Sequence, residues 1–300
     1  MKKKIMTSLL LMCAFALGAN AQLLYKISGK GLTKPSYIFG THHLAGGTFV
    51  DKIAGIKDAV AQTEQVYGEV SFDDMMNPDS LKQMQNAMML PEGQSLKTIL
   101  TPEQYKKFDD FLVKTMGVGM SNPQIEAQFG RMTPATLATQ LTVLMYLMRH
   151  PGEFDPNNQL DHYFQKQAKE SHKPVGGFET LAFQSHLLFN SKPIKRQIEE
   201  LMCLIDHEAY YLEMVESMSK AYNNQDINAL KSAMDTKLGD RCDATPEEED
   251  ALLGHRNANW LRLMPAIMQA RPTLFVVGAG HLPGDKGVLE GLKKMGYQVE

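Results

Sequence analysis

The stretches YIFGTHHL (residues 37–44) and FVVGAGHL (residues 275–282) carry the same pattern near the two ends of the chain. Each is an apolar run followed by glycine, two further residues, histidine and leucine, and each has another glycine two residues after that leucine. An apolar run that stops at glycine is typical of a buried strand that ends in a tight turn. The pattern therefore predicts two strand ends that each carry a histidine.

The residues around both stretches predict the order strand, loop, helix, strand twice. Helical spacing runs over 51–63 and a buried strand over 65–71 after the first stretch, and a helix over 287–295 and a short strand over 297–299 follow the second. The chain between them has mainly helical spacing. We therefore expect an α/β fold whose central sheet is built from two pseudo-repeated βαβ units, with a large, mostly helical insertion over about residues 73–253.

The first 21 residues have the pattern of a secretory signal peptide. Three lysines (2–4) precede an apolar stretch (6–17) that is too short to span a bilayer, and the tripeptide Ala-Asn-Ala at 19–21 is a small-residue cleavage signal. We expect cleavage after this tripeptide, a single α/β domain over residues 22–300, and export to the periplasm or out of the cell. An uncleaved N-terminal anchor is the alternative.

Charge and hydropathy exclude several classes of partner. The chain has 31 basic and 34 acidic residues, and loss of the three leader lysines leaves 28 against 34, a net charge of −6. An acidic chain is a poor partner for nucleic acid or an anionic membrane. The longest later apolar run, residues 141–148, has the length of a core helix, so we expect no membrane span in the mature chain. The sequence makes no prediction of oligomeric state.

Two cysteines, Cys203 and Cys242, follow the leader. Both lie in the helical region, and an oxidising compartment permits a bond between them. A disulfide and two buried free thiols both stay open, because the sequence does not give the distance between the two sulfurs.

His43 and His281 are the strongest candidates for a functional site. A Gly-x-x-His segment at the carboxyl end of a strand presents an imidazole at the sheet edge where ligands bind in open α/β sheets, and the glycine leaves room for a ligand. If the two units pack side by side, the imidazoles converge. Two neutral imidazoles and a carboxylate are a common divalent-metal set that leaves a position for water. The alternative is two hydrogen-bonded structural histidines, and His42 is expected to point elsewhere.

Glu69 is the best carboxylate partner for these histidines. It lies inside the apolar strand 66–70, where a charge is costly unless it is paired or binds a cation. It also belongs to the same βαβ unit as His43, so it can reach the same sheet edge. The alternative is a glutamate on an edge strand in water.

Glu179 and Arg256 complete the candidate set. Glu179 ends a predicted strand at 174–178, and three roles stay open for it: metal ligand, general base for a water, or a charge at a helix N-terminus. Arg256 precedes a predicted helix at 257–269 and would stabilise an oxyanion or hold a substrate carboxylate. The alternative for Arg256 is a surface residue that caps the helix. Asp161 is a candidate to orient a helix or a ligand.

Together these residues resemble the TraB/PrgY/GumN family, to which the TIKI proteases are related. The resemblance covers nearly the whole mature chain, and its segments are Tyr37–His43, Gly68–Glu69, Gly177–Thr180, Arg256–Asn257 with Trp260, and Val277–Gly284 with Gly287. Phe178 stands where leucine is expected in that family. The resemblance implies paired Gly-x-x-His motifs and a glutamate at a metal-dependent active site, with peptidase activity in TIKI-like members.

We therefore expect an exported metal-dependent hydrolase, a peptidase, that uses a metal-activated water on a peptide or protein substrate. His43, Glu69 and His281 are the predicted ligands of Mn²⁺, Co²⁺ or Zn²⁺. Glu179 is the predicted general base or further ligand, and Arg256 the oxyanion donor. The alternative is a non-catalytic exported protein that binds a peptide or small ligand in the same cleft.

Overall fold

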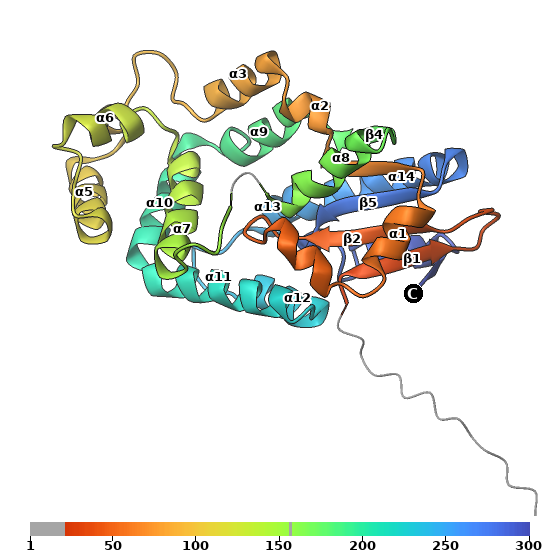
Figure 1. Ribbon diagram of the computed structural model, residues 1–300. Helices are drawn as coiled ribbons and strands as arrows, with labels where there is room; N and C mark the ends of the chain where they lie inside the picture. The colour runs from red at the N-terminus through yellow and green to blue at the C-terminus, as the bar shows by residue number, and fades with distance from the viewer. Residues whose placement is uncertain (1–21, 156–157) are drawn as a thin grey trace, which may run out of the picture.

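The computed structural model describes residues 22–155 and 158–300, with a six-stranded sheet at one end and a group of helices at the other (Figure 1). The predicted signal peptide, residues 1–21, lies outside the described residues. The sheet has the strand order β4-β3-β5-β2-β1-β6. Its strands are Leu24–Ser28 (β1), Ser36–Thr41 (β2), Gln65–Val70 (β3), Val175–Glu179 (β4), Thr273–Gly278 (β5) and Gln298–Val299 (β6). The predicted mixed α/β class is confirmed.

The centre of the sheet is parallel. β2 pairs with β5, β5 with β3 and β3 with β4 in parallel, whereas β1 runs antiparallel to β2 and β6. Gly40 lies opposite Val277 and Thr41 opposite Gly278. The two predicted βαβ units therefore interleave, because β5 lies between β2 and β3. This order brings the carboxyl ends of β2, β3 and β5 to one edge of the sheet, the edge at which parallel sheets bind ligands.

Most of the chain between the two Gly-x-x-His segments forms helices, in line with its helical spacing. Thr101 caps α5, since its hydroxyl accepts a hydrogen bond from the Gln104 amide and a proline opens the helix. The larger helices are Ile56–Gln62 (α1), Pro78–Ala87 (α3), Pro102–Met116 (α5), Pro123–Phe129 (α6), Pro134–Arg149 (α7), Leu160–Glu170 (α8), Leu181–Phe189 (α9), Ile194–Asp206 (α10), Glu208–Asn223 (α11), Ile227–Met234 (α12), His255–Ala270 (α14) and Val288–Lys294 (α15). Short turns of helix are Gly47–Lys52 (η1), Phe72–Met75 (α2), Leu96–Ile99 (α4), Pro246–Glu249 (α13), Asp250–Gly254 (η2) and Ala279–His281 (η3).

Residues 193–223, whose spacing favours one long or broken helix, form the two helices α10 and α11, because His207 has non-helical backbone angles (φ −119°, ψ 34°). Two other helices differ from the sequence prediction. α1 starts at Ile56 because a 3-10 turn takes up residues 47–52. α9 was not predicted, since its sequence LAFQSHLLF is apolar on nearly every side and has no amphipathic pattern.

Two clusters of buried apolar residues hold the molecule together. One surrounds the sheet, and the other lies among α5, α6, α7, α10 and α11. Phe164 of α8 and Phe178 of β4 belong to the sheet cluster, although both fall inside the range predicted as an insertion. Cys203 of α10 forms a disulfide with Cys242 in the loop before α13, which answers the question that the sequence left open.

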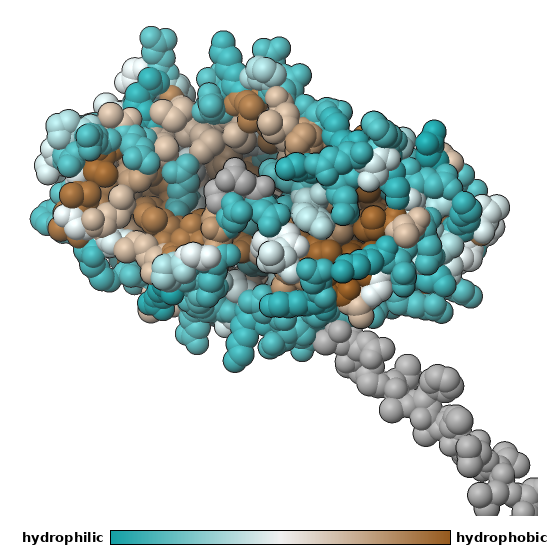
Figure 2. Space-filling view, in the orientation of Figure 1, coloured by the Kyte–Doolittle hydropathy of each residue, from teal (hydrophilic) through white to brown (hydrophobic). Residues whose placement is uncertain are grey.

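Polar residues cover most of the face seen in Figure 2. The same face has a hollow between the helical end and the sheet, and apolar residues gather in it. None of the described helices combines the length and the apolar character needed to cross a membrane.

Candidate active site

The two Gly-x-x-His segments lie side by side, because β2 and β5 are neighbouring parallel strands in matched register. Gly40 makes this contact possible. A Cβ atom added there would lie 2.8 Å from Leu282 and 3.0 Å from the backbone of Ala279, both in the other segment. The glycine of the first motif is therefore required for close packing against the second. The condition for convergence of the two imidazoles, that their segments lie side by side, is therefore met.

His43 stands at the open side of the site. Its side chain is 80% exposed, and its Nδ1 lies 2.8 Å from Oδ2 of Asp161, at the start of α8. The hydroxyl of Thr41 donates to the other oxygen of Asp161. The charge of Asp161 and its hydrogen bond with Nδ1 of His43 raise the pKa of His43 to about 9. Burial alone would raise the pKa of Asp161, but the charge and hydrogen bond of His43 and the Thr41 hydroxyl lower it to about 2.

His281 is buried on the other side of the site. The side-chain NH₂ of Asn257 donates to two backbone carbonyls, so its Oδ1 is the atom that faces His281 Nδ1 at 2.6 Å. This contact assigns the proton to Nδ1 and leaves a lone pair on Nε2. The ring also packs on Trp260, with centroids 4.3 Å apart. Burial, with the positive charge of Arg256, lowers the pKa of His281 to about 4, so the ring is neutral at pH 7.

Glu69 reaches the site from β3 and lies beside His281 and Arg256. One carboxylate oxygen, Oε1, accepts a 2.7 Å hydrogen bond from the amide of Gly278 and lies 3.8 Å from Nε2 of His281. The other, Oε2, accepts a 2.6 Å hydrogen bond from Arg256. Burial would raise the pKa of Glu69, but His281, Arg256 and the Gly278 amide outweigh it and lower the pKa.

Arg256 joins the two glutamates and His281. It donates to Glu179 from Nε (2.9 Å) and Nη2 (2.8 Å), to Glu69 from Nη2, and to Leu252 O (3.1 Å) and His281 Nε2 (3.0 Å) from Nη1. A guanidinium has five N–H groups, and each of them has a partner in this set. The side chains of Arg256 and Glu179 are only 8% and 4% exposed. Burial would lower the pKa of Arg256, and the two glutamates raise it.

Two further polar contacts hold Glu179 in place, and neither was predicted from the sequence. The indole N–H of Trp260 donates to Oε1 of Glu179 at 2.9 Å. The side-chain amide of Gln184 donates to Glu69 (2.9 Å) and to Glu179 (3.0 Å). Gln184 lies on α9, which gave no periodic signal, so nothing in the sequence pointed to it. Trp260 was named only through the family resemblance.

His42 points away from the site, as expected. Its ring packs on Tyr222, with centroids 5.2 Å apart. Burial, and next the neighbouring His43, lower the pKa of His42 to about 4. His42 is therefore a neutral packing residue at pH 7.

The donor chemistry of the site fits a divalent cation. His43 and His281 are each held through Nδ1, which leaves Nε2 as the ligand atom, an arrangement typical of metal-binding histidines. The positive guanidinium of Arg256 contacts both Glu69 and the Nε2 of His281, so the site accommodates a positive charge. Within the described residues, His43, Glu69 and His281 do not form a group whose donor atoms all lie within 4.8 Å. Holding one shared ion therefore requires side-chain movement.

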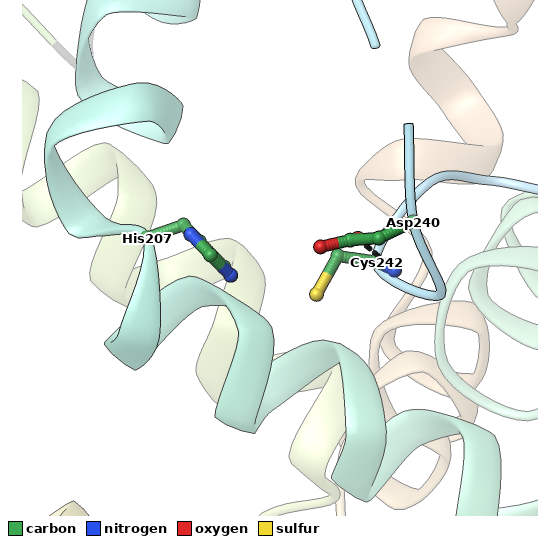
Figure 3. A group of neighbouring side chains, drawn as sticks. All are labelled: His207, Asp240 and Cys242. Carbon is green, nitrogen blue, oxygen red and sulfur yellow. Dashed lines mark hydrogen bonds between the residues drawn. The ribbon is translucent and has the colours of Figure 1, made fainter. Parts of the chain in front are cut away.

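The described part of the chain has one group of three potential ligands that meets this distance limit: His207, Asp240 and Cys242. Figure 3 shows the ring of His207 facing the carboxylate and the sulfur. However, the sulfur of Cys242 is bonded to Cys203 and is not a thiolate, the form that binds metals. The disulfide therefore removes one of the three ligands.

The fold and the site define an α/β protein in which two histidine-bearing strand ends meet beside a buried glutamate and arginine network. The model of the TraB/PrgY/gumN family matches residues 23–300. The chain therefore belongs to this family, as its sequence resemblance predicted.

Several curated proteins are similar to the chain at low identity. They include Metalloprotease TIKI2 of Danio rerio (25% identical, over 89% of this chain and 58% of that protein) and Metalloprotease TIKI1 of Homo sapiens (24%, over 89% and 59%). Metalloprotease TIKI homolog of Nematostella vectensis is 21% identical over 89% of this chain and 65% of that protein. The chain thus spans less than two thirds of the length of these relatives. No solved structure matches it.

Proposed function

We propose that the protein is an exported metal-dependent hydrolase that cleaves peptides. One observation carries the proposal: two imidazoles from neighbouring parallel strand ends are each anchored through Nδ1, and the partly buried carboxylate of Glu69 lies 3.8 Å from one of them, His281. The relatives at about 25% identity are named metalloproteases, which supports the same class. His43, Glu69 and His281 are the proposed ligands, and Mn²⁺, Co²⁺ or Zn²⁺ the proposed ion.

The residues of the chain have distinct parts in this proposal. A bound divalent cation would supply Lewis-acid polarisation of the scissile carbonyl and a more acidic water. Asp161 fixes the ring of His43, whose Nε2 is left for a ligand. Asn257 fixes the ring of His281, and burial keeps this ring neutral at pH 7, so that Nε2 is an electron-pair donor. Glu69 supplies negative charge, because its lowered pKa keeps it ionised.

The contacts favour a positioning role for Glu179 over the predicted role of general base. Both of its oxygens accept hydrogen bonds from Arg256, and Trp260 and Gln184 add one each. Arg256 has to exchange a partner before it can donate to an oxyanion. Of the side-chain partners, His281 is the uncharged one and therefore the weakest to lose. We accordingly assign the Nη1 of Arg256 as the oxyanion donor.

A non-catalytic protein that binds a peptide or small ligand in the same cleft is the second candidate. It is favoured by the fully engaged guanidinium of Arg256, which has no free N–H for a reacting group. In that case the buried charges serve to fix the shape of the cleft.

Metal analysis and digestion of a peptide library, each with and without chelator, test the proposal. We expect the purified protein to retain metal and to lose cleavage on chelation. His43→Gln and His281→Gln should each lower the cleavage rate by more than roughly 100-fold. A loss of up to that size is typical when only a residue that orients a metal ligand is changed. The matched control is His186→Gln, at an exposed position on α9. Metal without cleavage would favour the binding protein, and neither metal nor cleavage would make the histidines structural.

A further inference from the structure

A cavity of about 1040 Å³ lies beside the site, between α7, α10, α11, α12 and the loop that carries His281. Two of its lining residues belong to the surroundings of that histidine, since Gly280 precedes it and Asn257 holds its ring. A third lining residue, Leu252, accepts a hydrogen bond from Arg256 through its carbonyl. The cavity and the candidate active site therefore share a wall.

Apolar side chains from five different elements form much of this cavity. They are Val143, Leu204, Tyr211, Met214, Met234 and Leu253. Unbranched methionines adjust to ligands of different shape. Leu252 is 42% exposed although it is a large apolar residue, which leaves apolar surface open to a ligand. The volume lies at the upper end of the range for ligand pockets, so it exceeds the needs of a single side chain.

The lysines around the cavity are already paired. The three lysines among its described lining residues each contact a carboxylate: Lys231 with Asp235, Lys237 with Glu249, and Lys286 with Asp250. Capture of a phosphate or a free carboxylate needs a cation or an N–H donor that is not already engaged. The paired lysines therefore disfavour an anionic occupant, and the apolar side chains of the lining favour an apolar one.

We propose that this cavity is the subsite that receives bulky aliphatic or aromatic side chains of the peptide substrate. The proposal rests on the peptidase function proposed above and names the substrate class for it. A peptide that enters the cavity along Gly280 and Asn257 runs past His281, so that its backbone lies next to Arg256. The wall shared with the site, the apolar lining and the volume all favour this occupant.

Paired peptides that differ at one position, leucine or phenylalanine against asparagine, test the assignment. We expect the wild-type protein to prefer the apolar peptide by about tenfold or more in kcat/KM, from burial of one large side chain. Thr142→Trp places an indole in the cavity from α7, where the hydroxyl bonds only to its own helix. This variant should lose the preference through KM, while the rate with the polar peptide stays unchanged. Met148→Trp, on the same helix and outside the cavity, is the control.

Binding of fluorescent forms of the same peptides separates this proposal from the proposed function. If no peptide is cleaved but the apolar peptide binds and Thr142→Trp abolishes this binding, the subsite proposal is supported and the proposed hydrolase function is wrong. An apolar preference that survives in both Thr142→Trp and Met214→Trp would overturn the subsite. So would a wild-type protein that neither binds nor prefers the apolar peptide. The Met214 variant covers the case in which the first variant does not fold.

Discussion

The two Gly-x-x-His segments share a sequence pattern but give their histidines opposite surroundings. His43 is 80% exposed, and the contact with Asp161 raises its pKa to about 9. His281 is 6% exposed, and burial lowers its pKa to about 4. At neutral pH and without metal, one ring carries a positive charge and the other is neutral. The same eight-residue pattern therefore carries two histidines whose pKa values differ.

The difference comes from residues that lie far from either motif. Asp161, on α8, supplies a negative charge to the first ring, whereas Asn257, on α14, supplies a neutral acceptor to the second. The motif fixes where each imidazole lies relative to its strand, because the strand ends at the glycine. The partner of Nδ1 fixes its protonation. A site assembled from two copies of one motif can in this way contain a solvent-facing cation and a buried lone-pair donor.

The largest expected effect comes from removal of the buried arginine beside His281. Arg256→Ala leaves the buried Glu179 and the partly buried Glu69 without their shared cation, so we expect the free energy of unfolding to fall by about 3–5 kcal/mol. Chemical denaturation followed by circular dichroism measures this change. Arg262→Ala, at an exposed position on the same helix, should change stability by less than about 0.5 kcal/mol. A loss below about 1 kcal/mol for Arg256→Ala would mean that the network is not coupled to folding.

An intermediate effect is expected when the anchor of the buried ring is removed. Asn257→Ala deletes the acceptor of His281 Nδ1, so that the ring is free to change tautomer. We expect metal affinity to fall about 10- to 100-fold, measured by competition with a chelating dye. Asn259→Ala, an exposed residue of the same helix, serves as the control. Unchanged affinity in Asn257→Ala would show that this anchor does not act on a metal ligand.

The smallest expected effect concerns the exposed histidine, His43. In the metal-free protein, Asp161→Asn should lower the pKa of His43 from about 9 toward its ordinary value of 6.5, while His281 stays near 4. NMR titration of the imidazole C–H signals measures both.

The same substitution has a defined effect on stability. Because the folded pKa of His43 is raised, its contribution to stability is complete below about pH 6.5 and is lost as the pH rises through about 9. The stability difference between the wild-type protein and Asp161→Asn should therefore shrink over this range, by at most about 1 kcal/mol for so exposed a ring. A difference that grows with pH would contradict the assignment.

The sequence predicted the strand ends beside the candidate site better than it predicted the order of the strands in the sheet. The apolar runs that end at glycine identified β2 and β5, and the charge inside an apolar strand identified Glu69. The interleaving of β5 between β2 and β3 was not predicted, because strand order depends on contacts between segments more than two hundred residues apart. α9 and its Gln184 were missed because that helix is apolar nearly all round. The pseudo-repeat of the two halves stays a prediction.

By itself, the sequence determined which residues end the strands, where imidazoles and a carboxylate would stand, and which family the chain resembles. These are local properties, set by periodicity, glycine and the cost of burying a charge. The tertiary structure alone decided the register of β2 against β5, the pairing of Cys203 with Cys242, and the partners that make His43 basic and His281 neutral. Protonation and pairing depend on the distance between groups and on burial, and both exist only after distant segments have packed together.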